Sequence, residues 1–173
     1  QAMAWSESET VSTFDAWGRV LAQDVVSSLN VPALDNTSMD GYAVRCVDVA
    51  PGRPMEVSQR IPAGQVGTAL IPGSVARIFT GAPVPAGADA VLMQEEGTVL
   101  PDGRVQFARV PVAGQWIRSA GEDIQQGAVV LRSGERIGPA AMGLAASVGC
   151  ASLQVKRRPR VAMFSTGDEL VMP

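Results

Sequence analysis

The sequence predicts a mainly β fold with some α-helix, arranged as a compact β-barrel or sandwich. Three observations support this class. Short apolar and β-branched runs recur along the middle of the chain, separated by turns that contain proline or glycine. Eighteen glycines and twelve prolines exceed the combined average usage of roughly 12% for these two residues. Only one segment, after position 138, has a convincing helical period.

The start of the chain predicts little regular structure. Residues 1–9 are polar and rich in serine and glutamate, which indicates a frayed terminus. Ser12 and Asp15 have the spacing of a capping box, so a short helix should follow and stop at Gly18. Residues 19–31 alternate weakly between apolar and polar positions and predict an extended segment.

Short strands are predicted through the middle of the chain. Turn pairs such as Pro51-Gly52 and Pro72-Gly73 separate them. The clearest hairpin has Asp102-Gly103 at its turn, with apolar residues on both sides. The predicted strands are 42–47, 55–61, 76–80, 90–95, 105–108 and 128–131.

The predicted helix runs from Pro139, which suits the first helical position, to a cap at Gly149. Its apolar residues recur at i, i+3, i+4 and i+7, so one face should be buried; they are Ala141, Leu144, Ala145 and Val148. The basic run at 156–160 is interpreted as a solvated linker.

The C-terminal segment resembles the beginning of an α/β unit. Residues 160–164 predict a buried strand, and the glycine-containing polar loop 165–170 follows it. Ligands of such units bind beyond the carboxyl ends of the strands. Because the chain begins without Met and stops after this loop, we expect it to be a piece of a longer protein.

Composition excludes several classes of function. A net charge of -3 and a pI near 4.9 argue against a nucleic-acid-binding surface, which is basic. No apolar run is long enough to span a membrane, and no secretory signal is present, so we expect no membrane partner and a cytoplasmic location.

Histidine is absent, and Cys46 and Cys150 are far apart in the sequence. The chain therefore cannot supply a Ser-His-Asp triad or a Cys/His zinc site by itself. Any metal would be bound by oxygen atoms, which favours magnesium, manganese or calcium. The two thiols are interpreted as buried and reduced, although the sequence leaves a disulfide between them open.

The polar loop from Asp35 to Gly41 is the first candidate for chemistry. Two carboxylates, an amide and two hydroxyl groups fall within six residues, and a strand begins at Tyr42. Two interpretations stay open for these residues alone. They can build a turn and cap the strand, or they can bind a ligand.

Four polar loops share a glycine next to a hydroxyl or carboxylate group: 35–41, 79–85, 121–124 and 165–170. Glycine allows backbone amides to approach a ligand closely. Together with the Gly18-Arg19-Val20-Leu21-Ala22 motif, these loops resemble the MoeA family of molybdopterin molybdenumtransferases, whose animal relatives form the E domain of gephyrin.

The resemblance implies a multidomain subunit that forms a homodimer. Residues 1–38 and 130–157 would form a discontinuous, irregular α+β linker and dimerisation domain. Residues 39–129 would form an inserted β-barrel-like domain. Residues 158–173 would begin a molybdopterin-binding α/β domain, of which this chain contains only the first strand and its loop.

The resemblance also implies an activity in molybdenum cofactor biosynthesis. The family enzyme inserts molybdate into adenylylated molybdopterin and releases AMP, with Mg²⁺ taking part. Its partners would be a second subunit, the substrate, and the molybdopterin adenylyltransferase that supplies the substrate. The molybdopterin pocket would lie mostly outside this chain, so we expect the chain alone to be inactive.

Site residues follow from the same resemblance, position by position. The catalytic candidates are Asp40, Thr80, Asp123 and Glu169, and the substrate-binding candidates are Ser38, Gly81, Thr166 and Gly167. Asp40 and Glu169 would hold magnesium or a water molecule, and in a dimer they would meet across the subunits.

Two of these roles have alternatives. Thr80 would either donate a hydrogen bond to the substrate or position the Asp40 loop, and Asp123 could instead orient a neighbouring basic residue. A second hypothesis for the whole chain is a non-catalytic dimerising scaffold of the gephyrin E-domain type.

Overall fold

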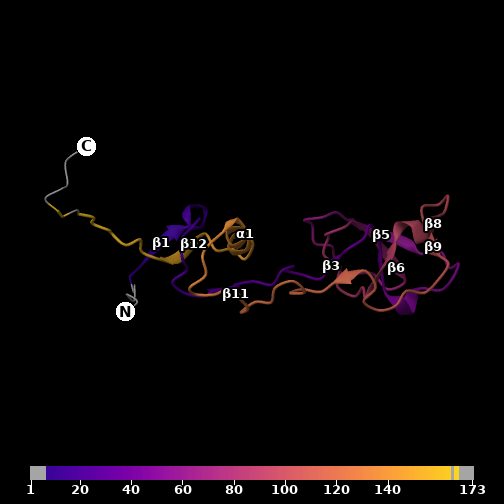
Figure 1. Ribbon diagram of the computed structural model, residues 1–173. Helices are drawn as coiled ribbons and strands as arrows, with labels where there is room; N and C mark the ends of the chain where they lie inside the picture. The colour runs from indigo at the N-terminus through magenta and orange to yellow at the C-terminus, as the bar shows by residue number, and fades with distance from the viewer. Residues whose placement is uncertain (1–6, 165, 168–173) are drawn as a thin grey trace. The chain divides into compact units, whose positions relative to one another are not determined.

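The computed structural model describes residues 7–164, 166 and 167 (Figure 1). The chain divides into two compact units. One unit contains 1–25 and 129–173, and the other contains 26–128. The mainly β class is confirmed, because strands and turns make up most of both units and α1 (Pro139–Ser147) is the one α-helix among the described residues. The domain boundaries predicted from the sequence stay a prediction.

The unit of residues 26–128 is built on a four-stranded sheet with the order β5-β6-β4-β7. β5 and β6 are parallel, whereas β4 is antiparallel to both β6 and β7. Pairing among the described residues leaves β5 and β7 as edges, so hydrogen bonds do not close a barrel there. The four strands are β4 (Gly41–Val44), β5 (Glu56–Ile61), β6 (Ser74–Ile78) and β7 (Ala90–Met93).

Both faces of this sheet are covered. Alternate residues of β4 enter different hydrophobic clusters, with Tyr42 in one cluster and Ala43 in the other. In the first cluster, the rings of Tyr42 and Phe107 meet edge to face with centroids 5.6 Å apart. All four residues of β4 are therefore buried, and the loop before Gly41 is anchored to the core of the unit.

Shorter elements complete this unit. β8 (Gly97–Val99) and β9 (Val105–Phe107) form the hairpin predicted at Asp102-Gly103. β3 (Asn36–Thr37) pairs with β10 (Ile117–Arg118) in antiparallel register. Two 3-10 helices follow strands of the sheet, η2 (Cys46–Asp48) and η3 (Gln94–Glu96).

The strand predicted at 90–95 is therefore too long, because β7 ends at Met93 and the chain turns into η3. The Glu96 side chain accepts a hydrogen bond from the Met93 amide at 3.0 Å, which stabilises this turn.

The other unit contains the predicted helix and an unpredicted strand pair. α1 starts with Pro139 as predicted, and Ala145 and Val148 are buried. β1 (Ser8–Ser12) pairs with β12 (Ser152–Lys156) along its whole length, from Ser8 opposite Lys156 to Ser12 opposite Ser152. The remaining elements are η1 (Thr13–Asp15), β2 (Val25–Val26), which crosses the boundary between the units, and β11 (Val129–Leu131).

Two predictions about the chain ends are wrong. The terminus predicted to be frayed at 1–9 is ordered at Ser8 and Glu9, because their backbone is paired with β12, whose Leu153 and Val155 alternate into the core. The rest of that prediction, at 1–6, lies outside the described residues. Residues 160–164 do not form a strand; they lack regular structure, and Met163 and Phe164 are exposed. A strand needs a neighbour for its backbone groups, and within the described residues this segment has none.

Candidate active site

The loop from Asp35 to Gly41 is held in shape by its own side chains. Thr37 is buried, its hydroxyl donates to the Met39 carbonyl at 2.7 Å, and its Oγ1 accepts from the Met39 amide at 3.1 Å. The turn interpretation of this loop is therefore correct for Thr37. It does not exclude the ligand interpretation, because the turn presents the next acidic side chain at the start of β4.

Asp40 contacts the second polar loop. Its Oδ1 accepts a hydrogen bond from the Thr80 amide at 2.8 Å and another from Thr80 Oγ1 at 2.7 Å. No donor among the described residues bonds to Oδ2, which leaves that oxygen available. The two bonds from Thr80, followed by the positive charge of Arg77, lower the pKa of Asp40 below its usual value. The carboxylate is thus ionised and fixed through one oxygen.

The two loops are also joined through their backbones. The Gly81 amide donates to the Thr37 carbonyl at 2.8 Å, and the Thr37 amide donates to the Ala82 carbonyl at 3.1 Å. Gly81 has a φ of +82°, a conformation that favours glycine. Ser38 Oγ donates to the Trp116 carbonyl at 3.2 Å. The structure therefore brings Ser38, Asp40, Thr80 and Gly81 together.

Asp123 does not contact the Asp40 carboxylate and bonds instead to Arg118. Both of its oxygens accept hydrogen bonds from Arg118 Nη2, each at 2.7 Å. This pairing, with a smaller contribution from Glu122, raises the pKa of Arg118. The loop that carries Asp123 is tied to the first loop, since Asp35 Oδ1 accepts a bond from the Ala120 amide at 2.7 Å.

The fourth loop contributes less to the described structure. Thr166 and Gly167 are exposed and belong to the other unit. Glu169, the second residue of the predicted metal pair, lies outside the described residues. Over the part of the chain that the structure describes, no group of three or more acidic or cysteine side chains is arranged to hold a metal ion.

Sequence reasoning missed three residues that contact this site: Arg77, Gln94 and Arg118. Arg77 donates to the Gly41 carbonyl at 2.8 Å, and the Gln94 amide donates to the Asp40 carbonyl at 3.0 Å. Arg118 lies opposite Asn36 in the β3-β10 pair. Their positions depend on strand register, for which these residues carry no local signal in the sequence.

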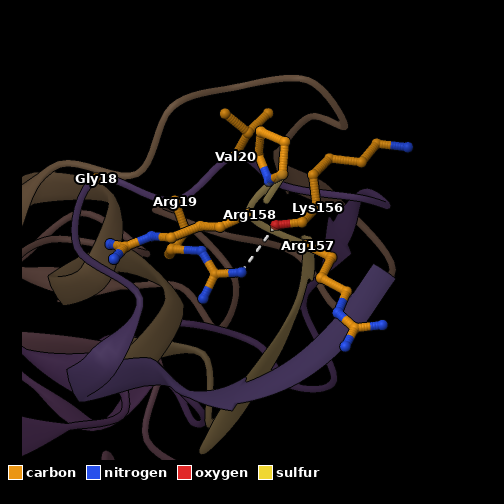
Figure 2. Close-up of a pocket in the computed structure, with 7 residues that line it drawn as sticks. Gly18, Arg19, Val20, Lys156, Arg157 and Arg158 are labelled. Atoms are coloured by element: carbon orange, nitrogen blue, oxygen red, sulfur yellow. Dashed lines mark hydrogen bonds between the residues drawn. The ribbon is translucent and has the colours of Figure 1, made fainter. Parts of the chain in front are cut away.

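The basic segment at 156–160 is more than a solvated linker. Lys156 ends β12, and the chain after it lines a hollow of about 430 Å³ together with residues 18–20 (Figure 2). Arg19 is nearly buried there; it pairs with Glu9 and donates to the Lys156 carbonyl at 2.8 Å. The motif Gly18–Ala22 thus has a structural role, because Leu21 is also fully buried.

Comparison with known proteins assigns the family. Residues 1–149 match the family model described as the MoeA N-terminal region (domain I and II). The chain belongs to the MoeA family. A molybdopterin molybdenumtransferase of Haemophilus influenzae is 41% identical over 96% of this chain and 41% of its own length. Molybdopterin molybdenumtransferase 2 of Mycobacterium tuberculosis is 42% identical over 95% of this chain and 42% of its own length.

A solved MoeA structure has the same fold. The molybdopterin biosynthesis MoeA protein of Pyrococcus horikoshii matches with a TM-score of 0.83 and 31% identity, over 89% of this chain and 41% of that one. The chain thus spans about two fifths of the length of the MoeA relatives it matches. Among its described residues, no helix is long and apolar enough to cross a membrane.

Proposed function

We propose that this chain is part of a molybdopterin molybdenumtransferase that acts in molybdenum cofactor biosynthesis. In this proposal the whole protein inserts molybdate into adenylylated molybdopterin and releases AMP. The observation that carries it is the Asp40 carboxylate, which Thr80 fixes through Oδ1 while Oδ2 stays available. The names of MoeA relatives, which are molybdopterin molybdenumtransferases, supply the reaction class.

Asp40 would act at the phosphoanhydride of the substrate. An ionised carboxylate can hold a magnesium ion or orient a water molecule, and magnesium is usually bound by one or two carboxylates together with waters and substrate phosphates. One available oxygen on Asp40 fits that mode and does not fit a metal cage built by protein alone. Bound magnesium would neutralise phosphate charge. Glu169 would supply the second carboxylate.

The hydrogen bonds of Thr80 and Gly81 favour positioning over substrate contact. Both donors of Thr80 bond to Asp40, and the Gly81 amide bonds to Thr37, so none of these groups is free for a substrate. Thr80 would therefore hold the Asp40 loop. Thr166 and Gly167 remain proposed substrate contacts. Both donors of Ser38 bond to the Trp116 carbonyl, so Ser38 would contact the substrate only as an acceptor. Asp123 would orient Arg118 toward an anion.

The proposed role of Asp40 is tested by Asp40→Ala in the full-length protein. We expect molybdenum insertion and AMP release to fall at least about hundredfold, as for the loss of a preorganised charged group, in a protein that still folds cooperatively. The matched control is Asp102→Ala, which removes an exposed carboxylate from the hairpin turn and should leave activity intact. Normal cofactor yield from Asp40→Ala would refute the proposal.

We also propose that the whole protein works as a cytoplasmic homodimer supplied by a molybdopterin adenylyltransferase, and that this chain alone does not turn over. If Asp40 and Glu169 meet across subunits, mixing the inactive full-length variants Asp40→Ala and Glu169→Ala should restore activity, because mixed dimers contain one intact site. A mixture that stays inactive would contradict a shared site. Dimerisation without activity in the unmodified full-length protein would favour the scaffold alternative.

A further inference from the structure

Arg77 lies at the centre of the strands that carry the Asp40 loop. It stands opposite Tyr42 of β4 in the antiparallel β4-β6 pair and opposite Arg60 of β5 in the parallel β5-β6 pair. Its side chain is half-buried. An arginine at this position must satisfy its donors inside the unit or lose hydrogen bonds to water.

The donors of Arg77 are satisfied by groups around Asp40. Nη1 donates to the Gly41 carbonyl at 2.8 Å and more weakly to the Ile78 carbonyl at 3.3 Å. Nη2 donates to the side-chain carbonyl of Gln94. The backbone amide of Gln94 donates to the backbone carbonyl of Asp40 at 3.0 Å. Arg77 therefore binds the backbone after Asp40 directly and the backbone at Asp40 through Gln94.

Aromatic rings fix the plane of the guanidinium group. Its central carbon lies 4.5 Å from the centroid of Phe79 and 5.2 Å from that of Tyr42. Phe79 immediately precedes Thr80, the residue that bonds to the Asp40 carboxylate. Arg77 thus contacts residues on both sides of the Asp40–Thr80 hydrogen bonds.

The contacts of Arg77 are not those of a surface ion pair. Within the described residues it forms no salt bridge, and its hydrogen bonds go to neutral carbonyl oxygens. The planar guanidinium group of arginine, with its several N–H donors, suits this arrangement. A lysine ammonium group could not bond in the same directions and stack on the rings. The identity of the residue matters, and not only its charge.

We propose that Arg77 is a positioning residue that holds the Asp40 carboxylate in place by bonding to the backbone of the Asp40 loop and stacking on the Phe79 ring next to Thr80. The effect of Arg77 on catalysis rests on the proposed function, whereas its effect on the structure of the Asp40 loop does not. Loss of Arg77 should release the Asp40–Thr80 contact without removing any group that touches the substrate.

Amide hydrogen exchange on this chain tests the structural part. In Arg77→Met we expect the Thr80 amide, which bonds to Asp40, to exchange about tenfold faster, a factor that corresponds to one ordinary hydrogen bond. The Val105 amide, which bonds to the Met55 carbonyl in the same unit, should keep its rate. In Arg77→Lys the Thr80 amide should still exchange faster than in the unmodified chain, so lysine should rescue its protection only in part.

The matched control is Arg60→Met. Arg60 is the neighbouring arginine, and its guanidinium lies 4.3 Å from the same Phe79 ring, but the hydrogen bonds found in the described structure do not connect it to the Asp40 loop. Arg60→Met should therefore leave the Thr80 amide unchanged. Equal rates for Thr80 in Arg77→Met and the unmodified chain would overturn the proposal. So would complete rescue by Arg77→Lys, or equal acceleration by Arg60→Met.

The catalytic consequence is measured separately. In the full-length protein, Arg77→Lys, which retains the positive charge, should lower kcat for AMP release while KM changes little, because the substrate contacts remain. Unchanged kcat with a faster Thr80 amide would overturn the catalytic role of Arg77. Activity that persists in Asp40→Ala would instead refute the proposed function, and the exchange result would still stand.

Discussion

Asp40 and Asp123 are both acidic residues in loops of the same unit, but their oxygens are used differently. Asp40 is held through one oxygen by the neutral donors of Thr80. Asp123 gives both oxygens to the charged guanidinium of Arg118. The first arrangement leaves one oxygen of an ionised carboxylate free for a cation or water. In the second, the charge of Arg118 balances that of the carboxylate, and the carboxylate orients the arginine. Neighbouring donors, more than the acid itself, decide what each carboxylate can do.

The largest effect is expected from Gly41→Ala, which should distort the Asp40 arrangement and destabilise the unit. An added Cβ would lie 2.0 Å from the Leu92 carbonyl oxygen, so β4 would have to move away from β7. We expect destabilisation of about 3 kcal/mol or more, at or above the usual range for overpacking. Urea unfolding of this chain measures it.

The matched control for Gly41→Ala is Gly143→Ala in α1. That position has no atom within 4 Å of the added Cβ, and alanine favours a helix by roughly 0.5–1 kcal/mol over glycine. Stabilisation is expected there. Unchanged stability in Gly41→Ala would show that the close approach of β4 and β7 is not required.

Thr80→Val tests whether neutral donors control Asp40. It removes the hydroxyl bond and keeps the amide bond, so the pKa of Asp40 should rise toward its usual value. Because the folded pKa of Asp40 is depressed, its contribution to stability exists above the unfolded pKa and is lost as pH falls through the folded pKa. Thr80→Val should weaken that acid dependence.

An NMR titration of the Asp40 carboxylate follows the change. Thr80→Ser retains the hydroxyl group and should restore the low pKa. If the pKa of Asp40 were the same in Thr80→Val and Thr80→Ser, the hydroxyl of Thr80 would have no part in setting it.

Asp123→Asn should change stability less. The pair with Arg118 is exposed, and exposed ion pairs contribute little and are screened by salt. We expect a small fall in melting temperature that disappears in high salt, while the pKa of Asp40 stays the same. A shift in the pKa of Asp40 would mean that the two carboxylates are electrostatically coupled. Each would then not be controlled by its own neighbouring donors alone.

A third acidic residue, Asp89, lies next to the Cys46 thiol. Burial first, and then Asp89, raise the pKa of Cys46 to about 11, and Asp89 Oδ1 accepts a bond from the Cys46 amide at 2.7 Å. Alkylation of Cys46 by iodoacetamide should therefore reach half its maximal rate near pH 11. Asp89→Asn should lower that midpoint, and a midpoint near that of an ordinary cysteine would contradict the assignment.

Local patterns predicted much of the fold. The hairpin at Asp102-Gly103, the start of α1 at Pro139 and the polar loop before Tyr42 each have a signal within a few residues. The strand pair β1-β12 was missed because its partners are far apart in the sequence and the alternation of Leu153 and Val155 covers one short strand. The run at 160–164 was apolar enough for a strand but has no described partner.

The site was predictable only in its residue types. The sequence places Asp40 and Thr80 in polar loops, and the family resemblance offers positioning of the Asp40 loop as one role for Thr80, but no local pattern specifies the hydrogen bonds between them. Arg77 carries no motif, and its contact with Gly41 follows from the register of β6 against β4. Register depends on how all the strands pack, so these contacts could be found only in the structure.

The connections of the Asp40 loop span long stretches of chain, and this determines when the site can form. Asp40 bonds to a residue 40 positions later, and Asp35 to one 85 positions later. During synthesis from the N-terminus, the acidic loop emerges before either partner exists, and contacts between distant positions are slow to form. The ribosome therefore releases the acidic loop before its contacts with Thr80 and Ala120 can form, and the full set of these contacts exists only after residue 120 has been added.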